Sequence, residues 1–285
     1  GSINLTNFVL EDETIKRVDY KRLREVIHLG VRFLDDVIEV NKYPIEPIDR
    51  MTKANRKIGL GVMGWADMLI RMGISYDSEN ALSLAEEIMG FLQREGRAAS
   101  ISLAQERGPF QNFPGSALEK RGEPPLRNAT VTTIAPTGTS SLIANCSSGI
   151  EPLFAVAFEK HVMDGERLIE VNPLFLQALK NRGMNPDEFL PSIAKHGSLR
   201  NISSIPDDLK RSFVTSHDIS PEWHIRMQAA FQKHTDNAVS KTVNFPNSAT
   251  IKDVETVFRL AHTLGCKGVT VYRDGSRDEQ VLNIG

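Results

Sequence analysis

Cysteine is scarce in this sequence, with only Cys146 and Cys266 among 285 residues. Two thiols are too few for a disulfide framework, and no C-x-x-C pair is present to supply zinc ligands. Such usage is typical of proteins from a reducing compartment, so we expect a cytoplasmic location. We interpret Cys146 as a small buried apolar residue, because that is the usual role of an unpaired cysteine.

Long apolar runs and an excess of one charge are also lacking. No apolar run approaches the roughly 18 residues that a membrane span needs, and no basic segment followed by an apolar one opens the sequence. The formal net charge is -2, which gives no general attraction to polyanions. We therefore expect neither a membrane nor a nucleic-acid polymer as partner, whereas a small phosphorylated ligand needs only a local pocket.

The common catalytic and metal-binding motifs are missing as well. The sequence has no H-E-x-x-H and no G-x-S-x-G, and His217, His224 and His234 lack the i, i+4 spacing of a helical zinc site. We therefore predict no metal site and name no catalytic residue. Glu151, in the segment GIEPLF, is the acid of most interest: it is either functional or a structural carboxylate that accepts backbone N–H bonds at a turn.

β-branched or alternating apolar segments predict strands. They lie at residues 1–10, 131–134, 155–162, 238–245 and 268–272, and an Asp-Gly turn at 164–165 follows the third. Because helices separate most of these near-continuous apolar segments, the pattern favours an α/β fold with a mainly parallel sheet or barrel.

Apolar residues at helical spacing predict long helices over residues 19–40 and 79–107. Pro44 and Pro47 would end the first of these. Mostly short helices are expected between residues 172 and 234, because Asn-Pro and Ser-Pro pairs there resemble helix starts. Capping signals stand at Asp77 or Ser78, Asn172, Asn185, Ser220, and Thr250 with Asp253, and Gly265 is an expected C-cap.

Gly59, Gly61 and Gly64 match the dinucleotide-binding pattern G-x-G-x-x-G. The segment before them, residues 51–57, is polar and basic rather than a buried strand, and no convincing ribose-binding acid follows about 20 residues later. We prefer the interpretation that these glycines permit close packing, with Trp65 and the apolar residues after it facing the core.

The most distinctive stretch is residues 131–155, where a β-branched run breaks at Pro136 into a hydroxyl-rich turn before an apolar segment. A strand that feeds a helix in this way leaves free N–H groups at the helix start, which form an anion site with help from hydroxyl donors. The alternative is that Thr139 or Ser140 simply caps the helix. The residues of this candidate site are Thr137, Gly138, Thr139, Ser140 and Ser141.

Five motifs in order carry a family resemblance across nearly the whole chain: SINLTNF, NRKIGLGVMGWADML, APTGTSSLIANCSSGIEPLFA, SKTVNFPNSAT and LGCKGVTVYRDGSR. Together they resemble the second half of the catalytic subunit of ribonucleotide reductase, specifically the adenosylcobalamin-dependent class II enzymes. The resemblance implies a ten-stranded α/β barrel of two five-stranded parallel halves. This chain would be the second half, a single barrel domain over residues 1–285, with strands at 2–8, 58–63, 131–134, 241–245 and 269–272.

The resemblance also implies roles for particular residues. The turn at Thr137–Ser141 would bind the phosphates of a ribonucleoside di- or triphosphate. Class I relatives carry two adjacent radical-relaying tyrosines in the last barrel strand, where this sequence has Thr270 and Val271, so adenosylcobalamin is the expected cofactor and radical source.

One part of the family pattern is missing from residues 1–285. The N-P-C-G-E segment with the radical cysteine and acid-base glutamate has no match, neither Cys146 nor Cys266 stands in a replacing motif, and there is no C-terminal cysteine pair. We therefore expect the chain alone to be inactive and to associate with a polypeptide carrying the first half-barrel or with itself, since a half-barrel exposes sheet edges. A split-gene product, a shortened chain and a non-catalytic nucleotide-binding or interaction module remain as alternatives.

Overall fold

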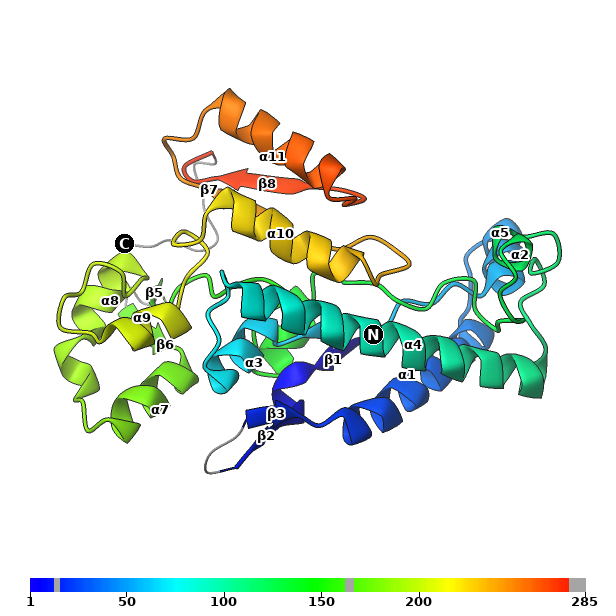
Figure 1. Cartoon of the computed structure of the whole chain (residues 1–285), viewed down its shortest axis with the longest axis horizontal. Coiled ribbons are helices and arrows are strands. Elements are labelled where there is room, and N and C mark those ends of the chain that lie inside the picture. The colour runs from blue at the N-terminus through cyan, green and yellow to red at the C-terminus, as the bar shows by residue number, and fades with distance from the viewer. Residues whose placement is uncertain (13–15, 162–166, 277–285) are drawn as a thin grey trace.

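The computed structural model describes residues 1–12, 16–161 and 167–276. Helices outnumber strands among these residues, and the longest helices, α1 (Tyr20–Val40) and α4 (Glu79–Arg107), pack against each other (Figure 1). None of the helices in the described ranges is long and apolar enough to cross a bilayer. The other helices are η1 (Leu5–Phe8), α2 (Glu46–Asn55), α3 (Trp65–Met72), α5 (Ala117–Lys120), α6 (Gly138–Ile143), α7 (Pro173–Asn181), η3 (Pro186–Glu188), α8 (Leu190–His196), α9 (Asp207–Ser212), α10 (Pro221–Gln232) and α11 (Ile251–Thr263).

Parallel strand segments form the framework. β1 (Ser2–Asn4) pairs in parallel with β4 (Gly61–Met63), and β7 (Thr242–Phe245) pairs in parallel with β8 (Thr270–Arg273). Residues 131–134 lie between these two pairs. The order of these segments is therefore β1, β4, 131–134, β7, β8, all parallel. The expected parallel direction is confirmed, with strands at four of the five expected places and single bridges at 131–134.

Single bridges join the middle segment to its neighbours. Leu60, just before β4, pairs in parallel with Thr132, and Ile134 pairs in parallel with Val239, just before β7. The N–H of Leu60 donates to the carbonyl of Val131 at 2.7 Å, and the N–H of Ser240 donates to Ile134 at 2.9 Å. The two strand pairs thus belong to one hydrogen-bonded ladder.

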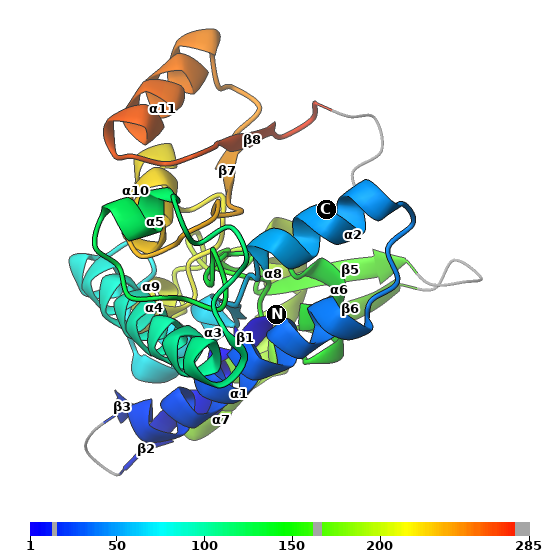
Figure 2. The same cartoon turned by 90° about the vertical axis from the view of Figure 1, so that its right-hand side faces the viewer.

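Two hairpins flank this ladder and are antiparallel. β2 (Val9–Glu11) pairs with β3 (Lys16–Val18), and β5 (Ala157–His161) pairs with β6 (Arg167–Val171). The second hairpin lies beside α6 and α8 in the view of Figure 2. β5 confirms the strand expected at 155–162, whereas the expected Asp164–Gly165 turn lies outside the described residues.

The expected helix starts are largely confirmed. Asp19 caps α1 by accepting the N–H of Arg22, and Ser78 caps α4 by accepting the N–H of Ala81. Thr250 and Asp253 form a reciprocal capping box at the start of α11. Each of these side chains satisfies an N–H group that the first helical turn cannot satisfy itself.

One expectation for the first 55 residues is wrong in part. The strand expected over residues 2–8 ends at Asn4, because the side chain of Asn4 accepts the N–H of Thr6 at 3.1 Å and starts the helical turn η1. The helix expected over residues 19–40 does end at Val40, before Pro44. Pro47 lies in the first turn of α2, where a proline loses no helical hydrogen bond.

The glycines of the G-x-G-x-x-G match serve close packing. A Cβ added to Gly61 would lie 1.9 Å from the carbonyl oxygen of Thr133, and one added to Gly59 would lie 2.6 Å from the Thr133 side chain. Gly64 has a φ of 74° and stands at the start of α3, whose Trp65 is completely buried. This confirms the packing interpretation: the segment brings β4 against residues 131–134.

A buried carboxylate joins α1 to the residues that enter the central strand. Asp35, fully buried on α1, accepts from Arg56 Nε at 2.8 Å, Arg127 Nε at 3.2 Å and Asn128 Nδ2 at 3.0 Å. Arg56 is 4% exposed and also pairs with Glu39. Because 127 and 128 directly precede the strand at 131–134, this network fixes where that strand begins.

We predict that Gly61→Ala lowers the free energy of unfolding by about 1–3 kcal/mol, because the new methyl group must displace the neighbouring strand. Gly268→Ala is the matched control, since a Cβ there meets nothing within 4 Å, and it should change the free energy by less than about 0.5 kcal/mol. Urea unfolding measures both. Equal effects of the two variants would contradict the close approach of β4 to Thr133.

We predict that Asp35→Asn lowers the free energy of unfolding by about 3 kcal/mol at pH 7, because buried guanidinium groups lose their carboxylate. Burial raises the Asp35 pKa, but the hydrogen bond and charge of Arg56, with those of Arg127, outweigh it and the net shift is downward. A lowered folded-state pKa stabilises the fold above the unfolded-state pKa, and this contribution is lost as the pH falls through the folded-state value.

Urea unfolding of the wild type and Asp35→Asn should therefore differ most at pH 7 and begin to converge as the pH falls below about 4. Glu255→Gln, which removes the exposed pair with Arg259, should change stability by under about 1 kcal/mol. A difference between wild type and Asp35→Asn that stays constant down to pH 3 would contradict the assignment.

Candidate functional site

The hydroxyl-rich turn follows the central strand directly and leads into α6. Thr137 stands at the helix start with a φ of 57°, a left-handed conformation that costs a threonine energy. Its hydroxyl does not cap α6; instead Thr137 Oγ1 accepts the N–H of Gly149 at 2.7 Å. A hydrogen bond to a residue 12 positions later in the sequence therefore holds the left-handed backbone of the turn.

The five predicted residues divide into two groups. Gly138, Thr139 and Ser140 are exposed, whereas Ser141 is 1% exposed and bonds to Ser148 Oγ at 2.7 Å. The first N–H groups of a helix have no partner within it, so the exposed group offers backbone donors together with hydroxyls. Thr137 and Ser141 shape the turn from inside.

The alternative that Thr139 or Ser140 caps the helix is wrong. The residue at the N-cap position is Thr137, and no side-chain capping bond is made there. Within the described part of the chain, the hydroxyls of Thr139 and Ser140 form no hydrogen bond. They are consequently free to meet a ligand.

Residues 147–151 lie beneath the turn and are held from two sides. The N–H of Ser147 donates to Asp67 Oδ2 on α3 at 2.6 Å, and Tyr76, 3% exposed, donates its hydroxyl to the carbonyl of Ile150 at 2.6 Å. Both partners are fixed in the core around α3. The segment is thus a rigid support for the residues above it.

Glu151 completes this support by joining it to β7. Its Oε1 accepts the N–H of Thr242 at 2.7 Å, and its Oε2 accepts from Lys241 Nζ at 2.6 Å. The same ammonium donates to His224 Nδ1 at 2.7 Å and to the Thr242 carbonyl at 2.6 Å, while His224 Nε2 meets the Ser216 carbonyl at 3.0 Å. The structural interpretation of Glu151 is therefore confirmed, with an ion pair that was not expected.

Burial sets the protonation of this cluster. Burial lowers the pKa of His224 to about 3, and the Lys241 charge adds to the effect, so the imidazole is neutral near pH 7 and accepts through Nδ1. Burial also lowers the pKa of Lys241, and the charge of Glu151 opposes that shift. All three ammonium hydrogens then have acceptors, as a buried cation requires.

A cavity of about 440 Å³ adjoins the buried side of the turn. Ser141 and Cys146 line it together with Asp67 and Arg71 of α3 and Phe158 of β5. Burial raises the Asp67 pKa despite its bonds to Ser147. The expectation of a buried Cys146 is wrong in part, because the thiol is partly exposed to this cavity; burial, with the Asp67 charge, raises its pKa to about 11.

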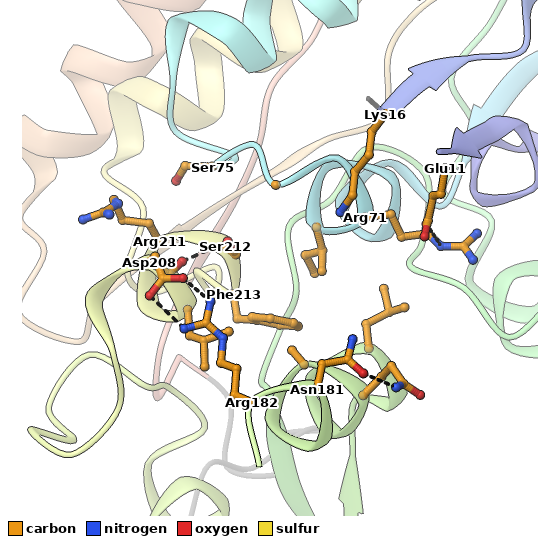
Figure 3. Close-up of a pocket in the computed structure, with 16 residues that line it drawn as sticks. Glu11, Lys16, Arg71, Ser75, Asn181, Arg182, Asp208, Arg211, Ser212 and Phe213 are labelled. Atoms are coloured by element: carbon orange, nitrogen blue, oxygen red, sulfur yellow. Dashed lines mark hydrogen bonds and ion pairs between the residues drawn. The ribbon is translucent and has the colours of Figure 1, made fainter. Parts of the chain in front are cut away.

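A second cavity, of about 640 Å³, lies between α3, α7 and α9 and shares Arg71 with the first (Figure 3). Arg182 points toward Asp208 and pairs with it, and Arg71 pairs with Glu11. None of the five turn residues lines this cavity. Its charged groups are thus largely satisfied by one another.

The three histidines near the C-terminal third do not converge. His224 bonds to Lys241 inside the core, His217 packs edge-on against Phe154, and His234 meets Gln93 at 3.3 Å. Among residues 1–12, 16–161 and 167–276, no group of three or more histidine, cysteine or acidic side chains could hold a metal ion.

Sequence reasoning missed Lys241, His224 and Asp67 as parts of the site. The sequence places Lys241 at the start of an expected strand, and nothing in SKTVNF indicates that its side chain is 0% exposed. One sequence signal could have indicated Lys241. An acid in an apolar segment, here Glu151, calls for a cation elsewhere in the chain, and Lys241 stands in an expected strand.

The comparisons with known proteins identify the family of the chain. A family model described as "Ribonucleotide reductase, barrel domain" matches residues 1–124 and 118–272. The "Vitamin B12-dependent ribonucleoside-diphosphate reductase" of Thermoplasma acidophilum is 50% identical over 100% of this chain, and that of Mycobacterium tuberculosis is 47% identical over 99%. The chain spans 36% and 40% of the lengths of these relatives.

A solved structure, the "Actinobacillus ureae class Id ribonucleotide reductase alpha subunit", superposes with a TM-score of 0.77 at 26% identity. The match covers 96% of this chain and 49% of that subunit. The parallel ladder and the turn after its central strand are thus parts of a known α/β fold, and the chain belongs to the ribonucleotide reductase barrel-domain family.

Proposed function

We propose that residues 137–141 bind the phosphates of a ribonucleoside di- or triphosphate in a vitamin B12-dependent ribonucleotide reductase. The observation that carries this proposal is the exposed set of Gly138, Thr139 and Ser140, which combines free helix-start N–H groups with unbonded hydroxyls at the end of a parallel strand. Ligands of open parallel α/β sheets bind beyond the carboxyl ends of the strands, where such groups gather.

Gly138 supports the proposal independently. An added Cβ there would meet nothing within 4 Å, and its φ does not lie in the left-handed region. The fold therefore does not require a glycine at this position, unlike at Gly61. A close approach of a phosphate to the backbone would require one.

The parent reaction is proposed from the relatives, which are named vitamin B12-dependent ribonucleoside-diphosphate reductases. Adenosylcobalamin would supply the radical that starts reduction. The cavity beside the turn measures about 440 Å³, which suits drug-sized ligands, and adenosylcobalamin is larger. This cavity does not hold the whole cofactor, so the role we derive for the turn is to hold and orient the nucleotide.

A partner polypeptide carrying the other half of the barrel is part of the proposal. β1 and β8 form the two ends of the parallel ladder, and each is paired on one side only among the described residues. An open edge is a template for another strand, and the chain covers 49% of the matched alpha subunit. Self-association would satisfy the same edges.

We predict that Gly138→Ala leaves the free energy of unfolding within about 0.5 kcal/mol of the wild type but weakens binding of ADP about tenfold, because the methyl group keeps the phosphates from the backbone N–H groups. Isothermal titration calorimetry measures binding, and urea unfolding is the control. Unchanged affinity for ADP would refute the close approach.

Thr139→Ala combined with Ser140→Ala should weaken ADP binding by roughly 1–3 kcal/mol, because charge-assisted hydrogen bonds from both hydroxyls are lost. Thr256→Ala, on the exposed surface of α11, removes a hydroxyl that only bonds to its own helix and should leave binding unchanged. A double variant that binds ADP like the wild type would leave the turn without a role in phosphate recognition.

We predict no reductase turnover with adenosylcobalamin for residues 1–285 alone, and turnover after mixing with a polypeptide that carries the N-P-C-G-E segment, because residues 1–285 contain no such motif. Formation of deoxyribonucleotide from ADP measures this. Turnover by the isolated chain would refute the placement of the radical site on the partner, and a mixture that binds ADP but stays inactive would favour a non-catalytic module.

A further inference from the structure

Lys241 is the most unusual charged residue in the described structure. Its side chain is 0% exposed, whereas the Glu151 side chain that pairs with it is 28% exposed. The three ammonium hydrogens are all used, on Glu151, His224 and the Thr242 carbonyl. No donor remains for a ligand, so Lys241 acts within the protein.

Stability does not explain a lysine at this position. Desolvating an ion pair costs about as much as its attraction returns, and apolar residues of similar size often serve the fold as well or better. What an ion pair with several hydrogen bonds does provide is a unique geometry. The question is therefore which geometry depends on this pair.

Hydrogen bonds lead from the pair to the turn in two short steps. Glu151 anchors its own segment to β7, and the segment returns to the turn through Gly149, whose N–H donates to Thr137 Oγ1 at 2.7 Å. A second link joins Ser148 to Ser141 at 2.7 Å. Ser148 and Gly149, in the segment that ends at Glu151, therefore hold both Ser141 and Thr137.

We propose that the ion pair of Glu151 with the buried Lys241 is a positioning device for the turn at residues 137–141. It fixes residues 148–151 against the start of β7. Thr137 then keeps its left-handed backbone, and the N–H groups of residues 138–140 all face solvent. Neither Glu151 nor Lys241 touches the phosphates. The inference rests on the proposed phosphate-binding function of the turn and extends it to two residues outside it.

The test uses Lys241→Met, which keeps the length of the side chain and removes the cation. Hydrogen exchange at the Gly149 amide should become about tenfold faster, because local opening of this segment becomes easier. Binding of inorganic pyrophosphate, measured by calorimetry on the full 285-residue chain, should weaken about tenfold because the donors are no longer preorganised. Glu151→Gln, which keeps an acceptor for the Thr242 N–H, should change both readouts in the same direction.

Lys233→Met is the matched control, since it makes the same substitution at an exposed lysine whose pair with Glu86 has no hydrogen bond to the turn. In this variant, the exchange rate of the Gly149 amide, compared with the rate set by global unfolding, should equal that of the wild type. The affinity for pyrophosphate should also be unchanged. Wild-type exchange and affinity in Lys241→Met would overturn the positioning role, as would an equal loss of affinity in Lys233→Met.

Failure of the proposed function itself gives a different result. If the wild type binds no pyrophosphate, the turn is not a phosphate site, and the positioning proposal falls with it. If the wild type binds pyrophosphate and Lys241→Met binds it equally well, phosphate binding stands and the positioning role alone is lost.

Discussion

The hydrogen bond from the Gly149 N–H to Thr137 Oγ1 is the interaction on which the candidate site depends. It uses the hydroxyl that would otherwise cap α6, and it stabilises a left-handed threonine that is unfavourable alone. The backbone strain is confined to Thr137. The hydrogen bond that offsets it comes from residues 147–151, which also contact α3 and β7. The site is therefore a property of the whole framework rather than of the turn sequence.

The framework that makes this bond possible is the parallel ladder. Close contact of Gly61 with Thr133 sets the distance between β4 and the central strand, while the Asp35 network fixes where that strand begins. Because Ile134 pairs in parallel with Val239, the turn after 131–134 lies beside the start of β7, where Glu151 accepts the N–H of Thr242. Positions far apart in sequence thereby form one support.

Local patterns predicted the fold well and the site in part. The strands β1, β5, β7 and β8, the helices α1 and α4 and the capping box of Thr250 and Asp253 are encoded within a few residues of sequence, and local patterns predict them. The strand β4 followed from the family resemblance alone. The end of β1 at Asn4 depends on one side-chain hydrogen bond, which periodicity does not show. The ion pair of Lys241 with Glu151 joins residues 90 positions apart, so no local pattern predicts it. The likeness to the reductase family pointed to the turn but not to what supports it.

The central claim is that phosphate meets the exposed backbone of the turn. Backbone amide shifts in NMR spectra, recorded as the chain is titrated with inorganic pyrophosphate, test it most directly, because each amide reports its own position. The account predicts that the largest shifts fall on Gly138, Thr139 and Ser140. Shifts centred instead on Arg182 and Arg211 around the cavity of Figure 3 would contradict it.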